Sequence, residues 1–256
     1  MPGSDPLAGR GLLQSPEEWA VRTRVLAETL SKLAARYLPP TPCRGLDVGC
    51  QTGDLTDYLN AHTSMSWEGI DPALTGPKLS PGGAPLYSAA SDDIPYPDDH
   101  FDCLLLANVF EHIAPERRHQ SFLEMYRVLR AGSILVGQLP NPYFPIESHS
   151  RLPLMGWLPV KVQKKYWRLS PVPWEHDFFT VTMRHLRREA ECVGFEVLYV
   201  GNFNYPLEAL PKVARPVAAI AKRPMQRFPW AWQFVLGRPD APKTGANHWS
   251  SRQGRQ

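Results

Sequence analysis

The sequence has little cysteine and no long hydrophobic run. Its four cysteines, Cys43, Cys50, Cys103 and Cys192, are far apart and form no C-x-x-C pair. With no signal-peptide pattern either, this favours reduced thiols and a cytoplasmic protein over a disulfide framework. The longest apolar runs, such as residues 104–107, are far too short to cross a bilayer.

The first half of the chain also lacks a stripe of basic residues. The net charge is +3, but residues 206–256 carry nine Lys or Arg against two acids, which makes this end +7 and the rest −4. This distribution argues against nucleic acid as a substrate and allows the basic end to contact a membrane or another anionic surface. The length of 256 residues and the 43% hydrophobic content predict one α/β domain with additions.

What the sequence does contain is a strand–turn–helix signal at residues 45–55, Gly-Leu-Asp-Val-Gly-Cys-Gln-Thr-Gly-Asp-Leu. Apolar residues flank Asp47. The glycines Gly49 and Gly53 allow a tight turn, and Thr52 is placed to cap the following helix. Such βα turns bind nucleotides in doubly wound folds. The dinucleotide fingerprint G-x-G-x-x-G does not fit these residues, which disfavours an NAD-dependent oxidoreductase.

Residues 47–53 resemble motif I of the class I S-adenosylmethionine-dependent methyltransferases, D-x-G-x-G-x-G, with Gln51 in place of the middle glycine. The resemblance extends over roughly residues 45–200 and depends on a series of motifs in the right order. It implies an α/β fold, a doubly wound, mostly parallel seven-stranded Rossmann-like sheet with helices on both faces. It also implies an enzyme that uses S-adenosyl-L-methionine as cofactor.

Several residues are expected at the cofactor. Residues 65–71 read as a second strand that ends in Asp71, at the spacing from Asp47 that suits an acid bound to the ribose hydroxyls. The family's adenine-binding acid would fall at Ala90, so either Asp92 replaces it or Ser91 and backbone groups hold the base. The expected cofactor-binding residues are Asp47, Gly49, Cys50, Gly53, Asp71, Pro72, Ser91, Asp92, Ala107 and Asn108.

Hydrophobic periodicity and turn residues predict the other elements. A helix capped by Ser15 runs from Pro16 to about Tyr37, and it either covers the cofactor or packs on the sheet edge. After an irregular segment at 72–83, strands are expected at 84–88, 103–107 and 134–139, from 194 onward, and at 230–236, the last one antiparallel. Helices are expected at 117–130 and 180–192, and a turn at 131–133.

One methyltransferase domain is expected over residues 16–236, with two insertions. Residues 143–179 form a lid after the fifth strand, and residues 203–228 form a basic, proline-rich insertion before the last strand. Residues 1–15 are expected to be mobile and residues 237–256 to be a disordered tail.

Three histidines are candidates for the catalytic base. His149 and His176 lie in the predicted lid, and His112 follows the fourth strand in an Asn-Val-Phe-Glu-His segment that resembles the family's motif there. Imidazole titrates near neutral pH, which suits it to deprotonating an acceptor. A structural hydrogen bond is the alternative role for each of them. Glu147 with His149, and Glu175 with His176 and Asp177, pair imidazoles with carboxylates and leave metal binding open, but no close two-histidine ligand spacing occurs, so no metal is expected.

The sequence therefore predicts methyl transfer to an oxygen or nitrogen of a small-molecule or lipid- or glycan-linked acceptor. One alternative is a catalytically inactive, cofactor-binding regulatory protein, because Gln51, Ala90 and Ser133 depart from the family pattern. Another is a quinone or lipid methyltransferase at a membrane surface, which implies a peripheral membrane contact. The sequence does not identify the acceptor or the oligomeric state.

Overall fold

The structure is a computed structural model that describes residues 16–39, 42–171, 176, 178–209, 215 and 228–240. The expectations for residues 1–15, for the Ser15 cap, for most of the basic insertion and for residues 241–256 lie outside these residues.

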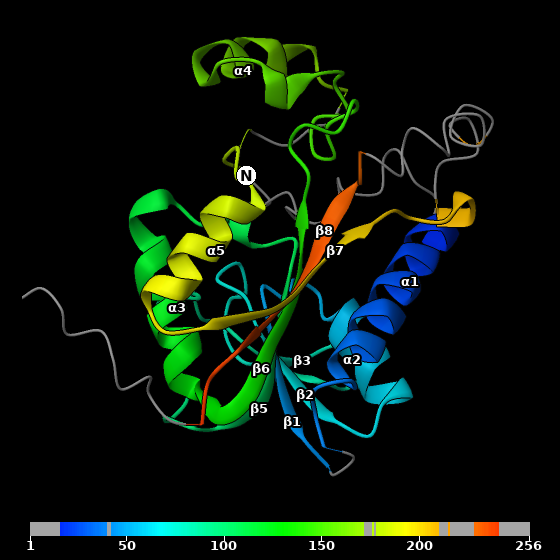
Figure 1. The fold of residues 1–256 in the computed structure, drawn as a ribbon. Coiled ribbons are helices and arrows are strands. Elements are labelled where there is room, and N and C mark those ends of the chain that lie inside the picture. Colours follow the sequence, from blue (N-terminus) through cyan, green and yellow to red (C-terminus); the bar gives the residue numbers. More distant parts are fainter. Residues whose placement is uncertain are drawn as a thin grey trace, which may run out of the picture.

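One eight-stranded sheet forms the centre of the molecule, in the order β3-β4-β2-β1-β5-β6-β8-β7 (Figure 1). Its strands are β1 (Arg44–Val48), β2 (Ser66–Ile70), β3 (Lys78–Leu79), β4 (Pro85–Tyr87), β5 (Phe101–Ala107), β6 (Leu129–Pro140), β7 (Glu196–Phe203) and β8 (Ala231–Gly237). Strands β4, β2, β1, β5 and β6 are parallel, whereas β8 pairs antiparallel with both β6 and β7. The carboxyl ends of the five parallel strands therefore meet at one edge of the sheet, where such folds bind ligands.

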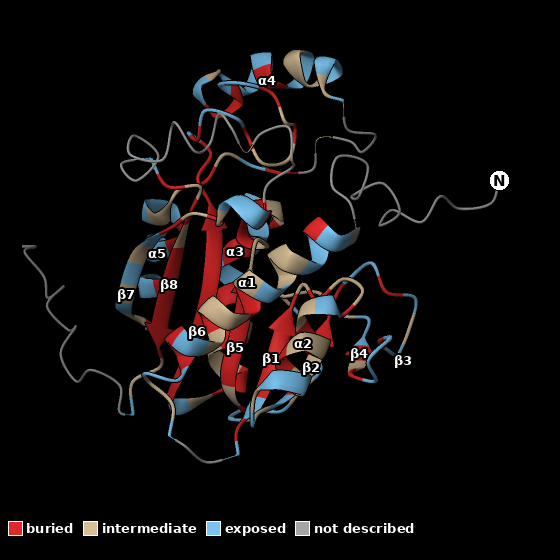
Figure 2. Cartoon of the chain, turned by 90° about the vertical axis from the view of Figure 1, so that its right-hand side faces the viewer, coloured by how far each residue is buried: buried red, intermediate tan, exposed pale blue. Residues whose placement is uncertain are grey.

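Helices cover both faces of the sheet. The longer helices are α1 (Pro16–Ala34), α2 (Asp54–His62), α3 (Pro115–Val128) and α5 (Met183–Cys192). Figure 1 shows α1 and α2 on one face and α3 and α5 on the other. Each face of the sheet has its own hydrophobic core. Leu30 of α1 belongs to the cluster that contains Trp67 of β2, and Phe122 of α3 belongs to the cluster on the other face, which contains Leu104 of β5. Figure 2 shows the central strands buried between these layers, whereas the edge strands β3 and β7 are more exposed.

The predicted fold class is confirmed, with small differences in extent. The eighth strand is the two-residue β3, which lies in the segment expected to be irregular. Helix α3 ends at Val128 because Leu129 and Arg130 already belong to β6, so the predicted turn at 131–133 is an irregularity within that strand. Helix α5 begins at Met183, three residues later than predicted, where Thr182 and His185 form a capping box.

The segment that follows β6 contains three short helices rather than an unstructured loop. These are η2 (Met155–Trp157), α4 (Val160–Tyr166) and η3 (Trp167–Leu169), and we call residues 143–179 the lid. Figure 1 shows α4 beyond the end of β6, at the edge where the parallel strands end. Within the described residues, the longest apolar helical stretch is too short or too polar to span a membrane. Two further helical turns, η1 (Phe110–His112) and η4 (Leu207–Ala209), lie beside the same edge.

Candidate active site

The loop between β1 and α2 has a backbone conformation that requires small residues. Gly49 and Gly53 have φ angles of 84° and 89°, in the left-handed region. A Cβ at Gly49 would lie 2.4 Å from Cγ2 of Val109, and one at Gly53 would lie 2.8 Å from Cβ of Ser80. Gln51 shares the left-handed conformation with a φ of 54°. The residue at the family's middle-glycine position therefore keeps a glycine-like backbone although it carries a side chain.

The capping role predicted for Thr52 is wrong. Helix α2 begins at Asp54, its N-cap is Gly53, and no side chain caps it. The Thr52 hydroxyl instead donates to the Asp54 carboxylate, at 3.2 Å. Because no side chain caps this helix, the backbone N–H groups of its first turn remain for other partners.

Asp47, at the end of β1, is a buried acid with one hydroxyl partner. Its Oδ2 accepts a hydrogen bond from the Thr56 hydroxyl at 2.8 Å, and its exposed fraction is 2%. Burial raises the pKa of Asp47 to about 7, and the hydroxyl of Thr56 only partly offsets that effect. A buried carboxylate in this state is stabilised by a cationic ligand, which is the charge that the expected cofactor carries.

Asp71 supports the same loop from the end of β2. Its Oδ2 accepts the backbone N–H of Gln51 at 3.0 Å, and its Oδ1 accepts the N–H of Ala73 at 2.8 Å. It is 8% exposed, and the neighbouring Pro72 is exposed. Asp71 therefore fixes the turn, and its predicted contact with a ribose stays a prediction.

The two residues expected near adenine are engaged with helix α3. Asp92 forms an ion pair with Arg117, and the Ser91 hydroxyl lies 2.9 Å from the Ser121 hydroxyl. The Arg117 guanidinium lowers the pKa of Asp92. Their adenine-binding roles also stay predictions.

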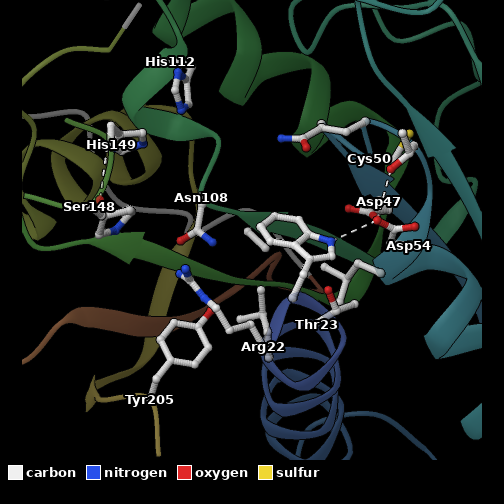
Figure 3. A pocket seen from close by; sticks show the side chains of 18 of the residues that line it. Arg22, Thr23, Asp47, Cys50, Asp54, Asn108, His112, Ser148, His149 and Tyr205 are labelled. Carbon is white, nitrogen blue, oxygen red and sulfur yellow. Dashed lines mark hydrogen bonds between the residues drawn. The ribbon is translucent and has the colours of Figure 1, made fainter. Parts of the chain in front are cut away.

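A cavity of about 310 Å³ opens beside this loop at the carboxyl edge of the sheet (Figure 3). Of the expected cofactor residues, it is lined by Asp47, Gly49, Cys50, Ala107 and Asn108. It is lined as well by residues that the sequence did not single out as site residues, namely Trp19, Arg22, Thr23, Leu26, Arg151, Tyr205 and Trp230. The lining of the cavity does not include the other expected cofactor residues, which are Gly53, Asp71, Pro72, Ser91 and Asp92. Burial and the charge of Asp47 raise the pKa of the Cys50 thiol far above neutral, so this thiol is not a nucleophile here.

Helix α1 packs on a face of the sheet and not on its edge, and it also lines the cavity, while its contact with the cofactor stays a prediction. Leu26, Ala27 and Leu30 belong to the core against the sheet, while Trp19, Arg22 and Thr23 face the cavity. The Trp19 Nε1 donates to the Asp54 carboxylate at 3.2 Å, which joins the start of α1 to the start of α2. The helical periodicity was the only sequence signal for this wall, because it placed residues 19, 22, 23 and 26 on one face.

His149 links the lid to the η1 turn through two buried carboxylates. Its Nδ1 lies 2.7 Å from Oε1 of Glu147, and its Nε2 lies 3.6 Å from Oε1 of Glu111. Burial alone would lower the pKa of His149, but Glu147 and then Glu111 raise it to about 10. Although burial opposes the effect, His149 and the backbone N–H groups of residues 149 and 150 lower the pKa of Glu147 to about 2. At neutral pH His149 is therefore an imidazolium, which is unsuited to act as a base.

The other two candidate bases have different positions. His112 lines the cavity, and its ring meets that of His149 edge-on with centroids 5.0 Å apart. His176 is not among the lining residues, and its ring stacks on Phe178, as does that of His149. Of the residues predicted around His176, Glu175 and Asp177 lie outside the described part of the chain.

The structure also groups possible metal ligands that the sequence spacing did not reveal. Glu111, His112 and His149 present ligand atoms that all lie within 4.8 Å of one another. They come from η1 and the lid, so their proximity depends on the fold and not on a local motif. His149 forms an ion pair with Glu111, while both buried carboxylate oxygens of Glu111 have no hydrogen-bond partner among the described residues, and the expectation of no metal stays a prediction.

Comparisons with known proteins agree with this geometry. Residues 46–137 match the profile of a family described as "Methyltransferase domain". A ubiquinone/menaquinone biosynthesis C-methyltransferase from Geotalea daltonii is 29% identical over 186 residues, covering 62% of this chain and 77% of the relative. A protein of the same name from Pseudomonas paraeruginosa is 27% identical over 142 residues, which is 48% of this chain but only 55% of that relative. The solved structure of an S-adenosylmethionine-dependent methyltransferase from Mesorhizobium loti superposes with a TM-score of 0.55 at 17% identity, covering 84% of this chain and 99% of that chain.

Proposed function

We propose that this chain is a class I S-adenosylmethionine-dependent methyltransferase and that it methylates an oxygen or nitrogen of a small-molecule acceptor bound between α1 and the lid. The observation that carries this proposal is the continuous cavity. One end is the Gly49–Leu55 loop, and the other is the wall formed by Asn108, His112 and His149. A donor held at the loop and an acceptor held at this wall would meet within one cavity.

The residues at the loop fit the cofactor. The left-handed backbone at Gly49 leaves room for a ligand against the main chain, and the buried Asp47 carboxylate would be compensated by a cation. When bound, S-adenosylmethionine supplies an electrophilic methyl group, which the acceptor takes while S-adenosylhomocysteine is released. The protein's contribution would then be alignment, which can supply about 7–11 kcal/mol in favourable cases.

His112 is the preferred base in this proposal. His149 is held as a cation between Glu147 and Glu111, and His176 lies outside the cavity wall. An imidazole on the wall could take the proton of a hydroxyl as its oxygen attacks the methyl group. It could also deprotonate an ammonium beforehand, which gives the nitrogen the lone pair that attacks the methyl group. The charged His149 nearby would stabilise negative charge that develops on an acceptor oxygen.

A second candidate is a lipid-linked or quinone acceptor at a membrane surface. The lid carries exposed apolar side chains, among them Trp157 at 57% and Leu169 at 70% exposure, beside three lysines of α4. The two relatives named above are called quinone-biosynthesis C-methyltransferases, so a carbon acceptor belongs to this candidate.

The test has two stages. Calorimetry should show binding of S-adenosylhomocysteine and no comparable binding of NAD, and the reverse result would exclude the proposal. A metabolite and lipid extract would then be incubated with the protein and cofactor carrying a ¹³C-labelled methyl group. Products would be found by mass spectrometry, and the chemical shift of the labelled carbon would distinguish methyl groups on oxygen, nitrogen and carbon. A label found only on carbon would contradict the first candidate and support the second.

A further inference from the structure

Two arginines from different parts of the chain line the acceptor side of the cavity. Arg22 comes from α1, and Arg151 comes from the lid, 129 positions later in the sequence. In Figure 3, Arg22 reaches toward the side of the cavity formed by Asn108 and Ser148, away from Asp47 and Cys50. The positive charge of Arg22 acts on Arg151 and lowers its pKa, so the two cations repel each other.

Arg151 is half-buried and lacks a full set of hydrogen-bond partners. Its Nε atom is inaccessible to solvent and has no hydrogen-bond acceptor among the described residues. Burial, followed by the charge of Arg22, lowers the pKa of Arg151 to about 10, which still leaves it charged at neutral pH. Buried guanidinium groups in proteins normally have each N–H satisfied, so an unsatisfied one that lines a cavity indicates a missing acceptor.

The nearest acid does not supply that acceptor. The negative charge of Glu147 favours the charged form of Arg151, but its carboxylate oxygens already accept hydrogen bonds from other groups. It accepts the backbone N–H groups of His149 and Ser150, at 3.0 and 2.6 Å, and it lies 2.7 Å from Nδ1 of His149. The carboxylate whose charge favours Arg151 is therefore already paired with His149.

Arg22 is held in place by aromatic rings. Its guanidinium carbon lies 4.6 Å from the centroid of Tyr205 and 5.7 Å from that of Trp230, both within cation–π range. These rings also line the cavity. The guanidinium is thus positioned between an aromatic wall and the space that an acceptor would occupy.

We infer that Arg22 and Arg151 form a subsite for an anionic group of the acceptor, a carboxylate or a phosphate monoester, with Tyr205 and Trp230 beside an attached ring or apolar group. Planar guanidinium groups bind such oxyanions through paired hydrogen bonds, and two of them can hold one anion from two sides. This inference rests on the proposed function, since it describes the acceptor of the same cavity. It narrows the acceptor to organic anions.

The subsite can be tested with simple probes. Phenyl phosphate, benzoate and the neutral benzyl alcohol would be titrated by calorimetry into the full-length protein, with and without S-adenosylhomocysteine. We expect at least one anion to bind more tightly than the alcohol, and the stronger of the two identifies phosphate or carboxylate. In Arg151→Gln, affinity for that anion should fall about 10- to 100-fold, the range for hydrogen bonds to a charged group. Arg151→Lys should restore only part of it, because lysine has no planar pair of donors.

Arg168→Gln is the matched control. Arg168 lies in η3 of the lid, is exposed and does not line the cavity, so the same loss of charge there should leave anion affinity unchanged. Equal binding of all three probes to the wild-type protein would overturn the inference, as would equal losses in Arg151→Gln and Arg168→Gln. Thermal unfolding of each variant checks that the fold is intact.

The cofactor's own carboxylate is the competing ligand for these arginines. If it were their partner, Arg151→Gln would weaken S-adenosylhomocysteine but not 5′-methylthioadenosine, which lacks that carboxylate, and this result would also overturn the inference. Failure of the proposed function gives a different result, because the wild-type protein would then bind neither adenosine compound whatever it does with the anions.

Discussion

Three residues of the cavity wall hold a backbone conformation that residues with side chains rarely adopt. Gln51, Asn108 and Arg151 have φ angles of 54°, 59° and 60°. A left-handed residue other than glycine costs roughly 1–2 kcal/mol. Strain of this kind collects at functional sites because surrounding contacts enforce it. Here the enforcing contacts are the Asp71 carboxylate on the N–H of Gln51 and the Gln138 amide on the side chain of Asn108.

Gln51→Gly tests whether the strain or the side chain matters for the cofactor. Glycine relieves the left-handed strain but adds chain entropy to the unfolded state, so stability should change by less than about 1 kcal/mol. Affinity for S-adenosylhomocysteine should be equal or better, as measured by calorimetry. Gln51→Ala, which keeps the strain and removes the amide, is the matched control. A large loss of affinity in both variants would make the glutamine amide a ligand contact.

Asp47→Asn should make the cofactor-free protein more stable and the cofactor weaker. The folded-state pKa of Asp47, about 7, is above its ordinary 3.8, so the folded protein binds more protons than the unfolded chain between these values. Stability contributed by this residue therefore falls as pH rises from about 4 to about 7. Melting curves of the variant should lack that fall, while Asn can still accept the Thr56 hydroxyl.

Cofactor binding should show the opposite trend with pH in the wild type. Affinity for S-adenosylmethionine should increase as Asp47 ionises near neutral pH, and the Asp47→Asn variant should show weaker affinity without this increase. Calorimetry across the pH range measures both. If the variant keeps the wild-type pH dependence, the group that titrates is elsewhere.

His112→Ala tests the proposed base. If His112 deprotonates the acceptor, turnover should fall about 10²- to 10⁴-fold while affinity for S-adenosylhomocysteine stays near that of the wild type. The pH–rate profile should lose its acidic limb. His119→Ala, an exposed histidine on α3, is the control. Near-normal turnover in His112→Ala would mean that alignment alone suffices for an acceptor that is already nucleophilic.

At the scale of elements, the lid is joined to the domain by a buried charge cluster. Glu147 and His149 belong to the lid, Glu111 belongs to η1, and the backbone N–H of Phe179 also donates to the carbonyl of Glu111 at 2.8 Å. Both ends of the lid thus meet the same short turn. Any opening of the lid has to break this cluster.

The pH dependence of the lid follows from the two shifted groups. The pKa of His149 is raised from 6.5 to about 10, so its stabilisation is complete below about pH 6.5 and is lost as pH rises through about 10. The pKa of Glu147 is lowered from 4.5 to about 2, so its stabilisation is present above about pH 4.5 and is lost as pH falls through about 2. The lid should be held most firmly between about pH 4.5 and 6.5.

His149→Gln should loosen the lid by roughly 3 kcal/mol or more, the usual cost of removing one partner from a buried ion pair. Amide hydrogen exchange within residues 143–171 should speed up accordingly, and the weakening at alkaline pH should disappear. His119→Gln should change neither. Unchanged exchange in His149→Gln would show that apolar packing holds the lid.

The elements that local pattern defines were predictable from the sequence. Strands β1 and β5 are short apolar runs bounded by glycine or acids, and the glycine turn follows β1 directly. The sequence placed these elements to within a residue or two. The errors came where tertiary contacts override local signals. Leu129 and Arg130 continue a helical pattern yet join the sheet, because Leu129 pairs with Phe101 of β5. Thr52 has a capping residue's chemistry, but the left-handed Gly53 takes the N-cap position.

Only the loop side of the cavity was predictable from the sequence. Asp47, Gly49 and Asn108 lie at or just after strand ends, and the topology of the sheet brings those ends together. The acceptor wall could not be assembled in this way. Arg22, Arg151 and Tyr205 come from a helix, a lid and a connection far apart in the sequence, and no local pattern relates them. The cationic state of His149 depends first on Glu147, two positions earlier, and then on Glu111, which lies 38 positions earlier and could not be paired with it from the sequence.

At the scale of the whole molecule, the exposed apolar surface and the positive charge of the lid lie together. We call Leu154, Trp157, Val160 and Leu169 the lid patch, and their exposed fractions are 54%, 57%, 58% and 70%. Figure 2 shows α4 at one end of the molecule, beyond the edge where the parallel strands end. Lys161, Lys164 and Lys165 are exposed on the same short helix. Exposed apolar side chains beside exposed lysines suit an anionic lipid surface.

The lid patch should therefore bind vesicles that contain anionic lipid. The protein should sediment with phosphatidylglycerol-containing vesicles and much less with pure phosphatidylcholine, and binding should weaken with added salt because the charges are exposed. Replacing the three lysines by glutamine should reduce the partition coefficient roughly 100-fold, since each basic residue near such a surface contributes about 1 kcal/mol, which is about fivefold. Replacing Trp157 and Leu169 by serine should reduce binding to a similar degree without changing its salt dependence. The control is Arg187→Gln on α5, which has the same type of charge loss away from the lid. Equal sedimentation of the wild type and the lysine variant would exclude the lid as the membrane contact and would favour a water-soluble acceptor.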